Sequence, residues 1–239
     1  MATALPGRAP SFAAQVWRVF KKDWQIELRT GEVLATTLFF SVLVTLTTSL
    51  AFSFGVEQET RVVPGALWIP VCFSSILGIA RIWVREREDN AFQSLLVSPL
   101  SRAALFMGKT FAATLFLLAV DAIVFPFVSL LFHVDIASVL FPVGILLAAG
   151  TFGAACAGTL FGVMTVRTRA RELVLSIVLF PLLLPTVLSG VAGTREVFFS
   201  VAKREPVWSV LSDYLALVLV FDGCIFFLGL LLFGALVED

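Results

Sequence analysis

The sequence predicts an all-α membrane protein, a polytopic bundle of six transmembrane helices with an amphipathic helix before them. Of the 239 residues, 59% are hydrophobic and 14% are charged, whereas a soluble domain carries about 25% charged residues. The mean hydropathy is +1.00. Apolar runs of about 18 or more residues, long enough to cross a bilayer, recur along the whole length. We therefore expect residues 1–239 to form a single transmembrane domain.

An amphipathic helix is expected over residues 11–30. Its apolar residues recur every four positions: Phe12, Val16, Phe20, Trp24 and Leu28. Its basic residues occupy other positions: Arg18, Lys21, Lys22 and Arg29. A helix with one apolar and one basic face lies in the plane of the membrane surface. A simple cationic leader is the alternative, but leaders rarely keep an apolar stripe at helical period.

Six apolar runs follow, each long enough to cross about 30 Å of hydrocarbon at 1.5 Å per residue. They occupy residues 33–54, 64–84, 105–132, 139–165, 173–191 and 214–236. Between the last two, segment 194–212 is partly apolar but is interrupted by charges and by Pro206, so we expect a short interfacial helix or re-entrant turn there. Four prolines inside spans are expected to kink them: Pro126, Pro142, Pro181 and Pro185.

Basic residues near the spans indicate the orientation, because Lys and Arg concentrate on the cytoplasmic side. With the N-terminus inside, thirteen of them fall on one side: Arg8, Arg18, Lys21, Lys22, Arg29, Arg81, Arg85, Arg87, Arg102, Lys109, Arg167, Arg169 and Arg171. Four fall on the other: Arg61, Arg195, Lys203 and Arg204. This asymmetry predicts that both ends of the chain are cytoplasmic.

The sequence lacks the residue constellations that enzyme chemistry, metal binding or nucleic-acid binding would require. It has one His, no CxxC spacing among Cys72, Cys156 and Cys224, and no GxxxxGK[ST] loop for a nucleotide phosphate. His133 beside Asp135 is a lone candidate ligand, and a metal or haem site needs several converging groups. The three cysteines are expected to be small packing residues in apolar surroundings. The net charge is zero, and there is no basic stripe for nucleic acid.

Two carboxyl groups fall near the middle of predicted spans, Asp121 in the third and Asp222 in the sixth. An ionised carboxylate there costs at least about 2.5 kcal/mol and usually faces a partner or water. Both are therefore candidates for a functional role. The alternative is that each is protonated or hydrogen-bonded inside the bundle, since no basic residue shares their predicted depth.

Small residues recur every four positions in the fourth span: Gly150, Ala154, Gly158 and Gly162. They share one helical face, where another helix can approach closely. This seam predicts tight helix packing, either with a neighbouring helix of the same chain or with a second copy in a homodimer.

The loop after the second span, residues 85–104, is the most informative stretch. Mixed charges at Glu86, Arg87 and Glu88 lead into an apolar stripe at i, i+3 and i+4: Phe92, Leu95 and Leu96. Pro99 is expected to end this element. A peripheral cytoplasmic protein could bind such a stripe in a groove. A solvated loop resting on lipid headgroups is the alternative.

The sequence resembles the CcmB family, the membrane subunit of the haem ABC transporter complex of cytochrome c biogenesis. The likeness is carried by several segments in order: Asp23 to Glu32, Pro64 to Trp68, Arg85 to Lys109, Arg167 to Glu172 and Pro181 to Pro185. It implies a permease similar to ABC-2 type exporters in the bacterial inner membrane. It also implies that the segment from Glu86 to Leu96 is a coupling helix, with the apolar stripe as its knob and the three charges orienting it.

The same resemblance implies the partners and the activity. A separate cytoplasmic ATPase would bind ATP and Mg²⁺, and its hydrolysis would drive release of a haem-loaded periplasmic chaperone. A haem-handling membrane subunit and a small helical subunit would complete the complex, and this chain would bind no cofactor of its own. The residues alone leave open an ABC-2 type permease for another cargo, such as a lipid-linked glycan or a drug, and a membrane scaffold without transport.

Overall fold

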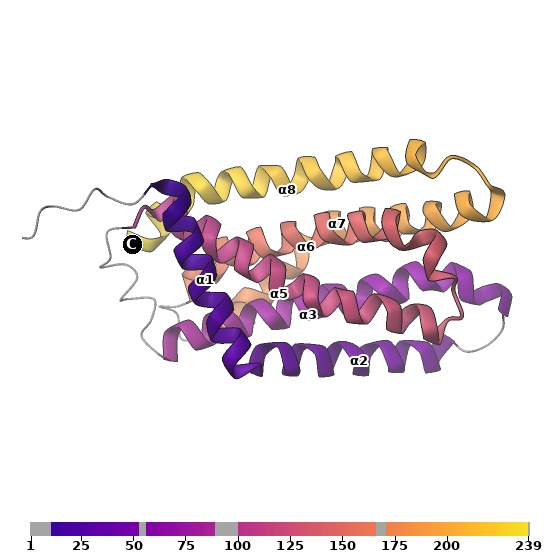
Figure 1. Cartoon of the computed structure of the whole chain (residues 1–239), viewed down its shortest axis with the longest axis horizontal. Helices are drawn as coiled ribbons and strands as arrows, with labels where there is room; N and C mark the ends of the chain where they lie inside the picture. Colours follow the sequence, from indigo (N-terminus) through magenta and orange to yellow (C-terminus); the bar gives the residue numbers. More distant parts are fainter. Residues whose placement is uncertain (1–10, 53–55, 89–99, 166–170, 239) are drawn as a thin grey trace, which may run out of the picture.

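The computed structural model describes residues 11–52, 56–88, 100–165 and 171–238. Within these ranges the chain forms helices and no strand. The helices are α1 (Phe12–Thr30), α2 (Glu32–Phe52), α3 (Val56–Glu88), α5 (Arg102–Leu131), α6 (Ile136–Thr165), α7 (Arg171–Lys203) and α8 (Val207–Glu238). Helices α2 to α8 run along the long axis of the molecule, and α1 crosses one end of the bundle (Figure 1). The C-terminal end of α8 lies at the same end.

The predicted amphipathic helix is confirmed as α1. It begins at Ser11, whose hydroxyl oxygen accepts a hydrogen bond from the Ala14 amide at 3.4 Å. It ends at Gly31, whose left-handed φ of 59° suits a residue without a side chain. Helix α2 begins at the next residue, so Gly31 forms the corner between the helix across the bundle and the first long helix.

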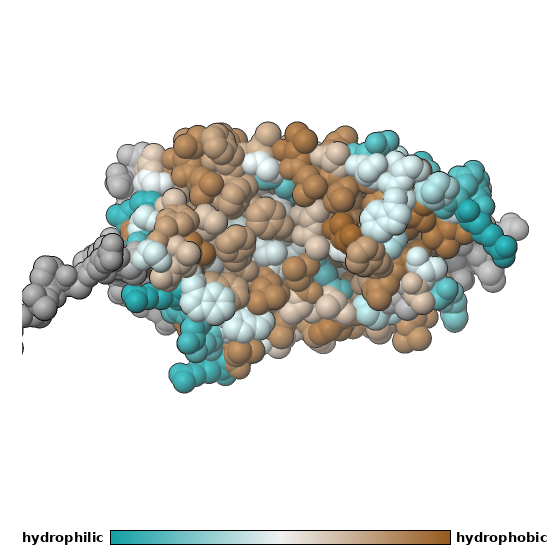
Figure 2. Space-filling model, turned by 45° about the horizontal axis from the view of Figure 1, so that its top comes forward, coloured by the Kyte–Doolittle hydropathy of each residue, from teal (hydrophilic) through white to brown (hydrophobic). Residues whose placement is uncertain are grey.

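The six expected spans are confirmed as six helices that are long and apolar enough to cross a membrane. Figure 2 shows a wide hydrophobic band on the visible face, with hydrophilic residues towards its two ends. Large apolar side chains remain exposed on the long helices, among them Phe39, Leu130 and Ile177 at 69–72% exposure. Surface of this kind is suited to lipid rather than water.

The structure corrects the expected segment 194–212. Helix α7 continues to Lys203 and α8 begins at Val207, so most of this segment belongs to the ends of two long helices. The helix persists beyond the apolar run because Arg195 is exposed on its surface, where its charge does not oppose helix formation. Only the stretch around Arg204, with a φ of 57°, reverses the chain. The prolines expected to kink spans also lie inside continuous helices.

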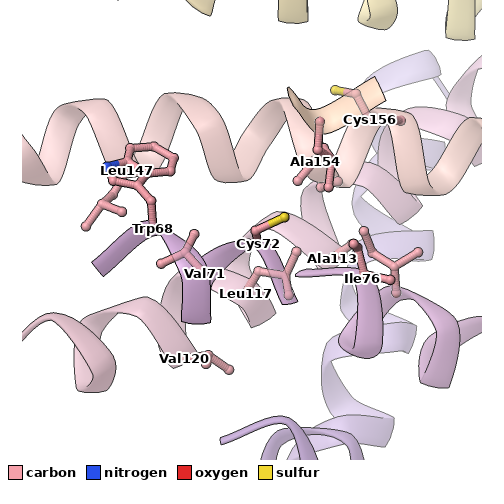
Figure 3. Packing of buried hydrophobic residues seen from close by; sticks show 14 of the residues in the cluster. Trp68, Val71, Cys72, Ile76, Ala113, Leu117, Val120, Leu147, Ala154 and Cys156 are labelled. Atoms are coloured by element: carbon pink, nitrogen blue, oxygen red, sulfur yellow. The ribbon is translucent and has the colours of Figure 1, made fainter. Parts of the chain in front are cut away.

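Helices α3 and α6 occupy the centre of the bundle. The most apolar stretch of each of these two helices is 67% and 61% buried, respectively, whereas the corresponding stretch is 28% buried in α2 and 22% buried in α8. Figure 3 shows side chains of α3, α5 and α6 packed together in the interior, among them Trp68, Leu117 and Leu147. Cys72 and Cys156 are buried as expected, but Cys224 is exposed on α8. Because Cys224 lies on the outward face of a peripheral helix, its apolar surroundings are lipid instead of protein.

Candidate functional site

Charged side chains from three helices converge at the end of the bundle that α1 crosses. They come from the middle of α1, the last turn of α3 and the second turn of α5. We call this set the elbow network: Lys22, Asp23, Glu27, Arg85, Glu86 and Lys109. The end of α3 within it leads directly into residues 89–99, which lie outside the described part of the chain.

Lys109 is the centre of the elbow network. Its side chain is only 3% exposed, and its Nζ lies 2.8 Å from Glu86 Oε1 and 3.3 Å from Asp23 Oδ2. The ammonium group also lies 5.5 Å from the centre of the Trp83 ring, within the range of a cation–π contact. A buried ammonium is tolerated only when it is paired and hydrogen-bonded. Lys109 therefore fixes α1 and α3 to the beginning of α5.

Glu27 makes a second connection, between α1, α2 and α3. Its Oε2 lies 2.8 Å from Arg85 Nη1, and its Oε1 accepts a hydrogen bond from the Leu34 amide at 2.8 Å. Arg85 Nη1 also donates to Thr30 Oγ1 at 2.9 Å. Leu34 lies in the first turn of α2, where amides have no partner inside the helix. Glu27 thus holds the corner between α1 and α2 against the end of α3.

Close backbone packing accompanies these ion pairs. A β-carbon at Gly108 would lie 2.6 Å from Val19 Cβ and 2.9 Å from the Val16 carbonyl oxygen. Only glycine permits this approach of α1 to α5. Gly108 and Lys109 are adjacent in the sequence. Gly108 provides the contact surface for α1, and Lys109 provides the charge that holds it.

The elbow network encloses too little space for a substrate. A cavity of about 40 Å³ lies beside Lys109, Glu27 and Arg85, enough for a water molecule but far below the ~300–1,000 Å³ of a small-molecule site. Among the described residues, no three His, Cys, Asp or Glu side chains are arranged to hold a metal ion. What the arrangement provides is a set of ion pairs that connect the end of α3 to α1 and to the beginning of α5.

Of the six predicted coupling residues, Glu86 is the one whose side chain the structure describes. Glu86 is 8% exposed and is paired to Lys109 and, at 3.2 Å, to Lys22. It faces the interior of this chain, where it belongs to the elbow network. Arg87 and Glu88 belong to the last turn of α3, but their side chains are outside the description, as are Phe92, Leu95 and Leu96.

Sequence reasoning missed most of the elbow network. Apart from ending one segment of the family resemblance, Lys109 enters the sequence analysis only as a basic residue that sets the orientation, although it is the fifth residue of an apolar run. A lysine at that depth requires a carboxylate, and this signal pointed to a buried pair. Its partners Asp23 and Glu86 could not be named, because Asp23 lies 86 positions away.

The two carboxyl groups in the spans have hydrogen-bond donors rather than basic partners. Thr151 Oγ1 of α6 donates to Asp121 at 2.6 Å, and Thr186 Oγ1 of α7 donates to Asp222 at 2.8 Å. Asp222 lies against Gly153 of α6, where any β-carbon would overlap the carboxyl group. Both side chains are at most 4% exposed. This geometry favours the interpretation in which each carboxyl group joins neighbouring helices.

We expect Thr186→Val to lower the free energy of unfolding by ~1–3 kcal/mol, because it leaves Asp222 buried without its donor. Asp222→Asn keeps an oxygen that accepts from Thr186 and should support normal function. Thermal unfolding of the purified variants and genetic complementation test both changes. Loss of function in a stably folded Asp222→Asn protein would instead indicate that Asp222 acts by carrying a charge or a proton.

The small-residue seam of α6 packs within the chain, against α3. A β-carbon on Gly150 would lie 3.0 Å from the Trp68 ring, and one on Gly158 or Gly162 would overlap Ile79 or Trp83. Ala154 is 3% exposed, and Trp83 Nε1 donates to the Gly158 carbonyl oxygen at 3.1 Å. The seam is thus occupied inside one chain, and a homodimer would need another surface.

Gly162→Ala should destabilise the protein by ~1–3 kcal/mol, because the added methyl group has to displace the ring of Trp83. Gly144→Ala, on the same helix, is the matched control, since nothing lies within 4 Å of its β-carbon. The control should stabilise by up to about 1 kcal/mol through helix propensity. Thermal unfolding in detergent measures both; equal midpoints for the two variants would contradict the packing of α6 on α3.

His133 belongs neither to the elbow network nor to the hydrogen-bonded pairs of Asp121 and Asp222. It is exposed, with a φ of 51°, in the turn after α5. Its backbone conformation is one that non-glycine residues adopt mainly in turns. Its place in the structure is that of a turn residue.

Comparisons with known proteins add evidence of a different kind. Residues 14–223 match the sequence model of the family described as CcmB protein. The chain is similar to Heme exporter protein B of Paracoccus denitrificans, with 30% identity over 184 residues, 73% of this chain and 80% of that protein. The protein of that name from Bradyrhizobium diazoefficiens is 26% identical over 200 residues, 81% and 86% of the two chains. That of Escherichia coli (strain K12) is 28% identical over 99 residues, 40% of this chain and 44% of the other.

Proposed function

Since this chain belongs to the CcmB family, we propose that it is the membrane subunit of an ATP-driven ABC transporter complex that delivers haem for cytochrome c maturation. The observation that carries the proposal is the match to the family over residues 14–223. Six apolar helices and the names of the similar proteins agree with it. In this role the chain is a permease subunit, and ATP is hydrolysed by a separate protein.

The elbow network supports a route for energy coupling. A cytoplasmic ATPase holding ATP and Mg²⁺ would bind the apolar stripe of Phe92, Leu95 and Leu96 in the segment between α3 and α5, which is shorter than the expected loop 85–104 because residues 85–88 belong to α3 and residues 102–104 to α5. Movement of that loop would displace the end of α3, and the Glu86–Lys109 ion pair of 2.8 Å would pass the displacement to α5 and α1. Nucleotide binding would thereby bias a bundle with two arrangements.

The proposed complex contains further proteins. A haem-handling membrane subunit and a small helical subunit would surround this chain, and a periplasmic chaperone would leave the complex loaded with haem. This chain is proposed to hold no cofactor itself. The exposed apolar faces of the peripheral helices α2 and α8 provide surface for neighbours, lipid or a second copy.

Purification of the tagged chain from its own host tests the function. We expect an ABC ATPase to be recovered with it, as identified by mass spectrometry, and the complex to show haem absorbance. Deletion of the gene should abolish covalent haem staining of c-type cytochromes. A complex without any ATPase would overturn the coupling proposal. An ATPase without haem, together with normal c-type cytochromes in the deletion strain, would indicate another cargo.

The proposed location is the bacterial inner membrane with both ends of the chain cytoplasmic. The thirteen-to-four distribution of basic residues supports this orientation. So does the position of α1 and the end of α8 at one end of the bundle (Figure 1). Green fluorescent protein fused after Asp239 should fluoresce, and alkaline phosphatase fused there should be inactive. The opposite pair of results would reverse the orientation.

A further inference from the structure

Helix α1 carries basic side chains that the elbow network does not use. Arg18, Lys21 and Arg29 are exposed and make no hydrogen bond or ion pair with the described residues. They line a groove of about 420 Å³ together with Lys22, Gln25 and Ile26. Among the described residues, no acidic side chain lines this groove, so its charge is complementary to an anion.

A second groove, entirely apolar in its lining, runs between α1 and α5. It measures about 550 Å³, and its lining residues are Phe12, Ala13, Val16, Trp17, Phe20, Met107 and Phe111. Trp17 is 61% exposed and stacks on Phe20 with 5.3 Å between ring centres. Exposed tryptophan of this kind is typical of the boundary between hydrocarbon and headgroups.

The two grooves border each other on the surface of α1. Trp17 lines the apolar groove and Lys21 the basic one, and residues four apart on a helix are surface neighbours. Arg18 is three positions from Lys21 and lies on the same side. Because Asp23 and Glu27 tie the other face of α1 to the bundle, this edge is held in a fixed position beside α5.

We propose that α1 and α5 form a binding site for one anionic phospholipid. An acyl chain lies in the apolar groove, and the headgroup phosphate pairs with Lys21 and Arg18. Arg29, two turns further along, adds to the positive field. The net negative charge of the headgroup distinguishes this ligand from a zwitterionic lipid, since the lining that the structure describes offers cations and no carboxylate. The site depends on α1 lying at the membrane surface and not on the ATPase or on haem.

Native mass spectrometry of the full chain in detergent tests the site, with phosphatidylglycerol and phosphatidylcholine of identical acyl chains as probes. We expect the protein to retain phosphatidylglycerol at least about tenfold better. Each cation at an anionic surface contributes about fivefold, so Arg18→Gln with Lys21→Gln should remove most of the preference. Lys203→Gln with Arg204→Asn takes the same charge from the opposite end of the bundle and should leave the preference unchanged.

The remaining arms separate the ligand from other anions. Trp17→Ser should weaken retention of both lipids while keeping their ratio, because it alters only the apolar groove. Inorganic phosphate at the concentration of the lipid should not displace phosphatidylglycerol; displacement would show that the headgroup alone is bound and would overturn the proposal. An unchanged lipid ratio in Arg18→Gln/Lys21→Gln would also overturn it. If that variant in addition lost the ATPase, the basic groove would be a docking surface for an acidic protein.

Discussion

Lys109→Met is expected to lower the free energy of unfolding by roughly 3–5 kcal/mol, because it removes the buried cation that Asp23 and Glu86 share and leaves only the partly exposed Lys22 to pair with them. The side chain of Lys109 is 3% exposed, so water cannot replace the lost partner. For a protein of this size, the thermal midpoint should fall by ~6–20 °C. Thermal unfolding in detergent, followed by size-exclusion chromatography, measures the change.

Two controls distinguish the ion pairs from the volume of the side chain. Lys203→Met removes an exposed lysine at the other end of the bundle and should change stability by less than about 0.5 kcal/mol. The triple variant Asp23→Asn/Glu86→Gln/Lys109→Met removes the stranded charges as well and should recover most of the loss, since neutral replacements of buried pairs are often tolerated. If Lys109→Met alone unfolds at the normal temperature, the elbow network does not hold α1.

The second large effect is expected from Leu95→Asp. A charge in the centre of the predicted apolar stripe should weaken recovery of the ATPase by ~30-fold or more, the loss typical of a central contact residue. Covalent haem staining of c-type cytochromes should fall with it. Because Leu95 lies outside the predicted spans, the chain should still insert, at normal abundance in the membrane fraction.

Ser94→Asp is the matched control for this prediction. If residues 92–96 are helical, Ser94 lies on the face opposite the apolar stripe, so the same charge there should leave ATPase recovery within about twofold. Normal recovery of the ATPase with Leu95→Asp would rule out the coupling-helix assignment. Equal losses for the two variants would mean that the loop tolerates no added charge and that the stripe is not the docking surface.

The transmembrane bundle was predictable because hydrophobic length is a local property. Each span is a run of apolar residues, and the requirement that its backbone bond internally makes it a helix. Helix ends were less predictable. Pro206 and the charges around it mark a short turn, but Arg195 sits on the surface of a continuing helix, and a hydropathy profile does not distinguish these two situations.

Contacts between distant segments were not predictable from one sequence. The Gly150 to Gly162 seam indicated close packing, but not that the rings of Trp68 and Trp83 fill it. Asp121 and Asp222 stood out by their depth, yet their threonine donors are indistinguishable in sequence from other threonines of the spans. Charge pairing is set by three-dimensional proximity, so Lys109 could be recognised as unusual without its partners being known.

The elbow network has a consequence for the order of events during synthesis. Lys109 bonds to Asp23 across 86 positions of the chain. At about 5–20 residues per second, a ribosome adds those residues in roughly 4–17 s. Over that interval α1 already exists while the lysine that fixes it to α5 does not. The attachment of α1 to the bundle is therefore completed late, when the third membrane helix arrives.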